Sequence, residues 1–231
     1  MKHRWLFVLT SHRELGSTGK KTGCWLEELA APYWQFVEAG YEVTLSSIAG
    51  GEAPIDPESM TGDWLSDEGR RFLADTSLRS LMANTPAVAD IEDTGFSGLF
   101  MVGGAGAAWD YPNSAKLCAL VEAFHARGAL IAGVCHGILG VARAVDGNGE
   151  PLVKGRRITC VSNVEEGVAG LDKVVPVLPE EVMRKLRALY TAAPVLAVNV
   201  VHDGAFFTGQ NPPSAKPLAK KIVEHLSRQP G

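Results

Sequence analysis

The sequence predicts an α/β fold in which helices cover a mostly parallel sheet. Short apolar runs alternate with longer amphipathic stretches, as in successive strand–helix–strand units. Two of the apolar runs lead directly into glycine-containing turns, where parallel strands commonly give way to helices. The chain has 231 residues, of which 46% are hydrophobic and 21% charged, so it is large enough to form a core as an ordinary globular domain.

The first half of the chain predicts strands at 5–10, 41–46 and 96–102, and a helix at 24–39. Pro32 is expected to kink or break this helix, and Gly40 to end it. Between about 50 and 94 the chain is polar and turn-rich, with one helical stretch at 67–82. We interpret this segment as an excursion over the sheet edge, so that residues 1–231 form a single domain.

The second half continues the alternation and contains a short helix directly after a buried strand. Pro112 lies near the first turn of one expected helix, and Gly128 closes it. Residues 229–231 are expected to form a frayed tail. The expected elements are helices at 112–127, 136–144 and 214–226, and strands at 129–134, 157–161, 195–201 and 205–208.

Composition excludes several classes of function. The net charge is −4 and no basic block is present, which argues against binding to nucleic acid or to an anionic membrane surface. The N-terminal apolar run is too short for a signal peptide, and no later run is long enough to cross a bilayer, so we expect a cytoplasmic protein. The four cysteines are widely separated and have no zinc-ligand spacing, so neither disulfides nor a metal site is expected.

Cys135 stands at the most informative position in the chain. The expected strand at 129–134 leads directly into Gly133-Val-Cys135-His136-Gly137, a nucleophile-elbow pattern with cysteine in place of serine. A helix N-terminus, the neighbouring imidazole and an open turn would all favour a reactive thiolate. The alternative is a core thiol that ends a buried strand.

A second glycine turn follows the expected strand at 96–102. Gly103-Gly104-Ala105-Gly106 should reach the same edge of the sheet, where a backbone N–H there and that of His136 would form a two-donor oxyanion hole. The alternative is an ordinary glycine-rich turn, and the spacing matches neither nucleotide-binding motif.

Two pairs of adjacent glutamates supply candidate carboxyl groups. In the first helix, one of Glu27 and Glu28 must point inward if Trp25 and Leu29 pack against the core, and a dry carboxyl could relay protons near pH 7. Either Glu165 or Glu166 could orient the imidazole of His136 and complete a Cys-His-Glu arrangement. The alternative for both pairs is a solvated surface position.

These motifs resemble the ThiJ/PfpI superfamily, and within it the heat-shock glyoxalase III branch. The resemblance runs in order over nearly the whole chain and implies a flavodoxin-like three-layer sandwich of the class I glutamine-amidotransferase type. It rests on Thr22-Gly23 with Glu28 and Pro32, Gly104 through Asp110-Tyr111-Pro112, Cys135-His136-Gly137, Ile158-Thr159 with Glu166, and Thr208-Gly-Gln-Asn211-Pro-Pro-Ser214-Ala215.

The resemblance also implies roles for single residues. Cys135 would be the nucleophile, Glu28 its proton relay, and His136 and Glu166 the other triad members. Gly104 and His136 would supply the oxyanion N–H groups, and Ala105 and Trp109 would line the substrate pocket. The branch commonly has histidine at the position of Ala105, so we expect substrate orientation or proton transfer to differ here.

The function implied is a lyase of the glyoxalase III type that converts methylglyoxal, a small α-oxoaldehyde, to lactate through a cysteine hemithioacetal. No cofactor, metal or glutathione is needed, and a homodimer is expected because the superfamily commonly dimerises. One alternative is a cysteine amidase or peptidase of the PfpI type. Another is a stress-response holdase chaperone, with Cys135 as an oxidation sensor and Trp64-Leu65 and Phe72-Leu73 as its apolar patch.

Overall fold

The computed structural model describes residues 3–228 and is built around a sheet with the strand order β2-β1-β3-β4-β8-β7. All neighbouring strands are parallel except β7, which is antiparallel to β8. This order, with β1 and β3 at its switch point, is that of the expected flavodoxin-like fold. The strands are β1 (Arg4–Leu9), β2 (Glu42–Ser47), β3 (Gly98–Met101), β4 (Leu130–Val134), β7 (Val200–Asp203) and β8 (Phe206–Gly209).

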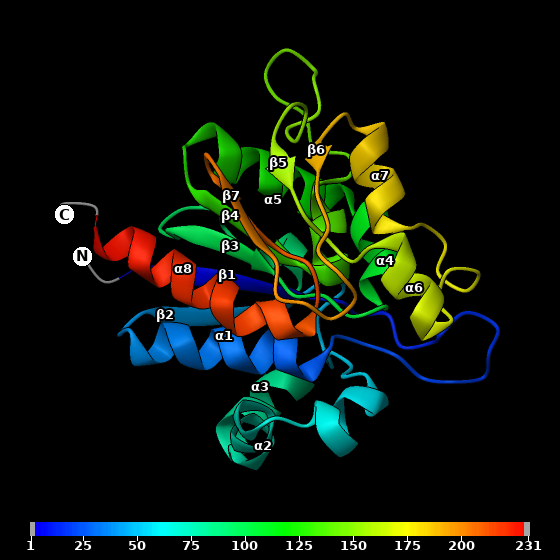
Figure 1. Ribbon diagram of the computed structural model, residues 1–231. Coiled ribbons are helices and arrows are strands. Elements are labelled where there is room, and N and C mark those ends of the chain that lie inside the picture. Colours follow the sequence, from blue (N-terminus) through cyan, green and yellow to red (C-terminus); the bar gives the residue numbers. More distant parts are fainter. Residues whose placement is uncertain (1–2, 229–231) are drawn as a thin grey trace.

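Helices cover both faces of the sheet and give the three expected layers (Figure 1). α1 (Leu26–Glu38) and α8 (Ala215–Ser227) pack together on one face, and α5 (Ala115–Ala126) lies on the other. β1 shows how the layers arise, because alternate side chains of a strand point to opposite faces. Trp5, Phe7 and Leu9 join the core beneath α1 and α8, whereas Leu6 and Val8 join the core beneath α5.

The excursion between residues 50 and 94 lies beyond α1 (Figure 1). The expected helix at 67–82 is divided into α2 (Asp67–Ala74) and α3 (Thr76–Ala83). Asp75 causes the break, because its carboxylate accepts hydrogen bonds from Ser77 N–H at 2.9 Å and Leu78 N–H at 3.0 Å and so begins a new helix. The remaining turns are η1 (Pro57–Met60), η2 (Gly62–Trp64) and η3 (Val88–Asp90). The single-domain organisation stays a prediction.

Several expected boundaries in the second half were wrong. The helix expected from 112 begins at Ala115, because Ser114 caps it by accepting the Leu117 N–H at 3.1 Å. The strand expected at 195–201 begins only at Val200. The remaining elements are α4 (Ala107–Asp110), η4 (Tyr111–Asn113), η5 (Cys135–Val141), β5 (Arg157–Ile158), α6 (Asn163–Ala169), α7 (Pro179–Lys185), β6 (Leu189–Tyr190) and η6 (Pro212–Ser214).

β5, which was expected to span 157–161, is two residues long and pairs only with β6, outside the main sheet. The helices α6 and α7 were not anticipated. Across residues 3–228, no helix has both the length and the apolar character needed to cross a membrane. The four cysteines are free thiols. The expected frayed tail at 229–231 lies outside the described residues.

Candidate active site at the carboxyl edge of the sheet

Cys135 lies immediately after β4, at the carboxyl edge of the sheet, and its backbone has the unusual φ of +55°. A positive φ is rare for a residue with a side chain and marks a sharply constrained turn. Gly137 permits this turn, because a Cβ there would lie 2.2 Å from the Met101 carbonyl oxygen at the end of β3. Cys135 is 7% exposed, so its sulfur lies in a nearly closed corner.

The imidazole of His136 lies between the sulfur and a carboxyl group. Its Nδ1 is 3.3 Å from Cys135 Sγ, and its Nε2 is 2.6 Å from Glu166 Oε1. The Nε2–Oε1 contact is close, although the two groups are not aligned as a straight hydrogen bond. All three side chains are buried, so solvent screens their interactions little. Cys135, His136 and Glu166 therefore form a continuous chain of polar contacts.

Glu165 does not contact His136. The sequence left open which of Glu165 and Glu166 would do so, and the structure distinguishes them. Its carboxylate accepts hydrogen bonds from the Ser162 N–H and hydroxyl, from the Gln210 and Asn211 amides, and from the Leu196 N–H, at 2.8 to 3.1 Å. With Ser162 it forms a capping box at the start of α6. Glu165 thus ties α6 to two later segments, and Glu166 is the glutamate that reaches His136.

Glu28 points inward from the first turn of α1 and is fully buried. A Cβ placed on Gly103 would lie 2.3 Å from Glu28 Oε2 and 3.0 Å from Cys135 Cβ, so the carboxyl and the cysteine flank the same glycine. Neither Glu28 oxygen has a partner among the conventional donors of the described residues. Burial raises the Glu28 pKa to about 8, although the interaction with the Cys135 thiol opposes that rise. Glu28 is therefore mostly a neutral acid at pH 7.

The expectation of a resting thiolate at Cys135 was wrong. Burial raises the pKa of this thiol well above its ordinary value, and the nearby carboxyl groups of Glu28 and Glu166 raise it further. The backbone N–H of His136 acts in the opposite direction but does not outweigh them. The turn N-terminus identified in the sequence is present, but desolvation and negative charge dominate there. The resting sulfur is a thiol.

The glycine turn after β3 reaches the same corner, as expected. The N–H of Gly104 is taken by no acceptor among the described residues, and the N–H of His136 is directed at the sulfur. Both N–H groups are therefore free of competing carbonyl partners from elsewhere in the fold. Such donors can bind an oxygen that becomes negative during a reaction.

One wall beside this turn contains a residue that the sequence analysis left without a role. His12, in the loop after β1, stacks flat on Trp109, with ring centroids 4.7 Å apart and planes 6° apart. His12 thus brings an imidazole to this wall, whereas position 105 is occupied by a buried alanine, 4% exposed. Sequence spacing carried no signal for this pair, because His12 lies in the loop after β1 whereas Trp109 lies in α4.

Asp110, the last residue of α4, binds the loop after β1. Its Oδ2 accepts the Ser11 N–H at 2.7 Å and the Thr10 hydroxyl at 2.9 Å, whereas its buried Oδ1 has no hydrogen-bond partner in the described part of the chain. Burial raises the pKa of Asp110 to about 6, against the effect of these hydrogen bonds. Asp110 therefore attaches α4, which follows the glycine turn, to the end of β1.

The apolar patch named for the holdase alternative was partly wrong. Phe72 is 1% exposed and belongs to the core beneath α1. Exposed large apolar side chains occur instead on α6 and in the chain between β6 and β7, among them Val164, Val168, Val195, Leu196 and Val198. Residues 3–228 contain no group of three or more histidine, cysteine, aspartate or glutamate side chains arranged to hold a metal ion.

Comparison with known proteins places this geometry in a family context. The model of the DJ-1/PfpI family matches residues 22–225. Glyoxalase 3 of Candida albicans is 29% identical over 227 residues, which cover 94% of this chain and 96% of that protein.

Two solved structures match almost the whole chain. Rapid Encystment Protein 24 KDa (REP24) of Francisella tularensis superimposes with a TM-score of 0.93 at 34% identity, covering 98% of this chain and 99% of that one. Glyoxalase III of C. albicans superimposes with a TM-score of 0.89 at 28% identity, covering 96% of each chain. The similarity therefore includes the excursion and α6 as well as the central sheet.

Proposed function

This chain belongs to the DJ-1/PfpI family, and we propose that it is a glutathione-independent glyoxalase that converts methylglyoxal to lactate. The glyoxalase names of its full-length relatives support the proposal. The structural observation that carries it is a fully buried Glu28, with a pKa of about 8, beside the Cys135 thiol. A carboxyl with this pKa can give and take a proton near neutral pH, which is what an aldehyde-to-acid rearrangement needs.

The first step in this proposal is addition of Cys135 to the aldehyde carbon. The thiol gives its proton to His136 Nδ1, 3.3 Å away, as the carbon–sulfur bond forms. Glu166 balances the imidazolium charge through its contact with Nε2. The aldehyde oxygen takes the negative charge beside the Gly104 and His136 N–H groups and is then protonated by the imidazolium, which leaves a neutral hemithioacetal.

The second step moves hydrogen between the two substrate carbons. Glu28, in its carboxylate form, removes the hydrogen from the sulfur-bearing carbon as a proton, and the freed electron pair forms a double bond to the neighbouring carbonyl carbon. The ketone oxygen takes the proton of the hemithioacetal hydroxyl, which leaves an enediolate with its negative charge on the oxygen of the sulfur-bearing carbon. Glu28 then gives its proton to the neighbouring carbon as that charged oxygen re-forms a carbonyl group, which yields a thioester. Water cleaves the thioester to lactate and the free thiol, so methylglyoxal plus one water gives lactic acid with no external oxidant. Cys135 takes the place of an external thiol throughout.

Access to the sulfur favours this reaction over the amidase or peptidase alternative. Cys135 is 7% exposed and lies among buried side chains. A peptide substrate would have to bring its carbonyl and two flanking residues to that corner, whereas a three-carbon aldehyde needs little room. A small substrate therefore suits the observed burial better.

The direct test is lactate production from methylglyoxal by the wild type and by Cys135→Ala. We expect the variant to lose at least about a thousandfold of kcat/KM, because covalent catalysis is removed. Cys118→Ala, which alters a partly exposed thiol on α5, is the matched control and should leave the rate unchanged. An unchanged rate in Cys135→Ala would overturn the proposal, and peptide cleavage without lactate formation would favour the hydrolase.

We also propose a cytoplasmic homodimer. The family resemblance supports this part of the proposal. Size-exclusion chromatography with light scattering tests the dimer, and fractionation of the source cells tests the location.

A further inference from the structure

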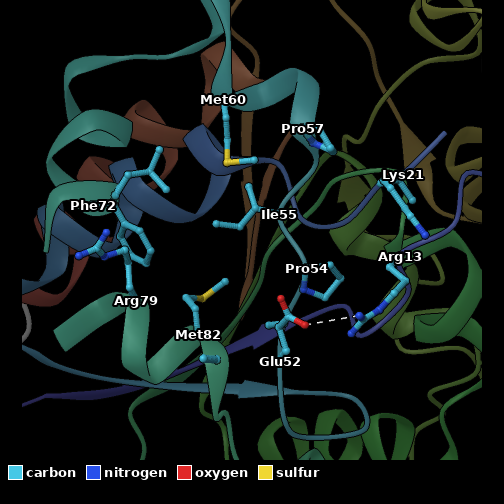
Figure 2. Close-up of a pocket in the computed structure, with 14 residues that line it drawn as sticks. Arg13, Lys21, Glu52, Pro54, Ile55, Pro57, Met60, Phe72, Arg79 and Met82 are labelled. Carbon is cyan, nitrogen blue, oxygen red and sulfur yellow. Dashed lines mark hydrogen bonds and ion pairs between the residues drawn. The ribbon is translucent and has the colours of Figure 1, made fainter. Parts of the chain in front are cut away.

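A cavity separate from the candidate active site lies between the excursion and the loop that follows β1 (Figure 2). Its volume is about 440 Å³, within the range of about 300 to 1,000 Å³ typical of small-molecule sites. Cys135, His136, Glu28 and Glu166 are not among its lining residues. The cavity is therefore lined by a different set of residues from the proposed catalytic corner.

The inner wall of the cavity is apolar. Figure 2 shows Ile55, Met60 and Met82 pointing toward one another, with Phe72 to one side and Pro54 below. Methionine side chains are flexible and polarisable, so they adapt to apolar ligands of different shape. This wall suits an aliphatic chain or a ring.

The rim of the cavity carries more positive than negative charge. Arg13, Lys21 and Arg79 line it together with the single carboxylate of Glu52. The whole chain has a net charge of −4, so this local excess of cations runs against the overall composition. An anionic group is therefore favoured at this rim over a cationic one.

The rim cations are free enough to bind a ligand. Arg13 and Glu52 are 3.4 Å apart and both more than half exposed, which makes a weak ion pair. Arg79 makes no ion pair with the described residues. Lys21 pairs with Glu14, and the side chains of both are exposed. Figure 2 shows Arg13 and Lys21 on one side of the cavity and Arg79 on the other, so an anion on the first side would replace weak contacts of Arg13 and Lys21.

We propose that this cavity binds a small amphipathic anion, the carboxylate of a free acid, whose apolar chain lies against Ile55, Met60 and Met82 and whose charged group meets Arg13 and Lys21. The inference is independent of the proposed glyoxalase activity, because it uses different residues.

The cavity wall is joined to the backbone that leads into α1. The Pro54 carbonyl accepts the Cys24 N–H at 2.9 Å, and the Asp56 N–H donates to the Cys24 carbonyl at 2.8 Å. Thr22, another lining residue, donates its hydroxyl hydrogen to Asp56 at 2.8 Å. These bonds hold the wall in place without a ligand, so the cavity is largely preformed.

The experiment is a titration of the full chain, labelled with ¹³C on the methionine methyl groups, with sodium octanoate as the probe. We expect saturable shifts of the Met60 and Met82 methyl signals, assigned through Met60→Leu and Met82→Leu, and no shift of the buried Met101. 1-Octanol and octyltrimethylammonium serve as neutral and cationic probes and should bind more weakly. Arg13→Gln should weaken octanoate binding by roughly two- to fivefold, as expected for one exposed ionic contact.

Arg70→Gln is the matched control, since Arg70 is an exposed arginine of the excursion that does not line the cavity. It should leave octanoate affinity unchanged. Absence of saturable shifts at Met60 and Met82 would overturn the site, and equal affinity for octanoate and octanol would overturn the role of the cations. Binding of an acidic peptide in place of octanoate would equally contradict a small-acid ligand.

Discussion

The starts of α1 and α6 make an instructive comparison, because each contains two adjacent glutamates and each directs the second one at the same cysteine–histidine pair. In α1, Glu27 accepts a hydrogen bond from the Ser66 hydroxyl while Glu28 turns inward. In α6, Glu165 caps the helix while Glu166 turns inward. In both helices the first glutamate is a structural tie and the second faces the site.

The two inward glutamates differ in their partners. Glu166 lies against an imidazole, which can carry a positive charge. Within residues 3–228, Glu28 has no cation or conventional donor beside it, and its pKa rises to about 8. The same side chain thus becomes a counter-charge in one place and a proton carrier in the other. Mutation of each glutamate can test this difference directly.

Glu28→Gln should have the largest effect. We expect kcat for methylglyoxal to fall by about a hundred- to ten-thousandfold, because an amide cannot carry the proton. In the wild type, kcat/KM should rise with pH and level off above about 8, where Glu28 is ionised, and this limb should vanish in the variant. Glu27→Gln, at the adjacent position, should retain both rate and limb. An unaltered rate in Glu28→Gln would remove the proton role.

Glu165→Ala should produce the next largest effect, on stability. The change leaves several buried donors unsatisfied, so we expect the free energy of unfolding to fall by about 3 kcal/mol. The segment around Leu196, whose φ is +59°, loses its tie to α6 and should be cleaved more readily by protease. Urea denaturation and limited proteolysis measure the two effects. If the free energy of unfolding of Glu165→Ala lies within about 0.5 kcal/mol of the wild-type value, this network does not stabilise the fold.

Asp110→Asn tests a carboxyl group that is intermediate between Glu165 and Glu28, because only one of its two oxygens accepts hydrogen bonds. A raised pKa in the folded state favours the protonated form, so this contribution to stability is present below about pH 4 and is lost as pH rises through about 6. The loss amounts to at most about 3 kcal/mol. Unfolding measured from pH 4 to 7 should show a shallower decline in Asp110→Asn than in the wild type. Identical slopes would contradict the assignment.

Glu166→Gln should have the smallest effect of the series. The amide keeps contact with His136 but loses the charge opposite the imidazolium, so we expect kcat/KM to fall by roughly ten- to a hundredfold. The pH limb assigned to Glu28 should remain, which distinguishes the two inward glutamates. Steady-state kinetics across pH 6 to 9 make the measurement. If the rise of kcat/KM with pH disappeared in Glu166→Gln, the two glutamates would not have the separate roles proposed here.

Local sequence pattern predicted most of the sheet and the position of Cys135, because strand alternation and the glycine turns act over a few residues. A further local signal was missed. Ser162-Asn-Val-Glu165 is itself a capping-box pattern, and it would have predicted α6 and assigned Glu165 to the cap.

The protonation state of Cys135 could not be predicted in this way. It depends on Glu28 and Glu166, which are distant in the chain, and on the burial of all three side chains. The stacking of His12 on Trp109 is equally non-local, because it forms only when the loop after β1 meets α4. Turn motifs place a reactive group in the fold, but the finished core sets its electrostatics.

The close approach of Gly137 to the Met101 carbonyl constrains any effort to redesign this protein. A library varied at position 137 would lose members for reasons of folding before any assay of turnover began, since even a methyl group there would collide with the backbone at the end of β3. Selection for soluble expression alone would therefore retain the catalytic corner's shape, although it never tests the chemistry.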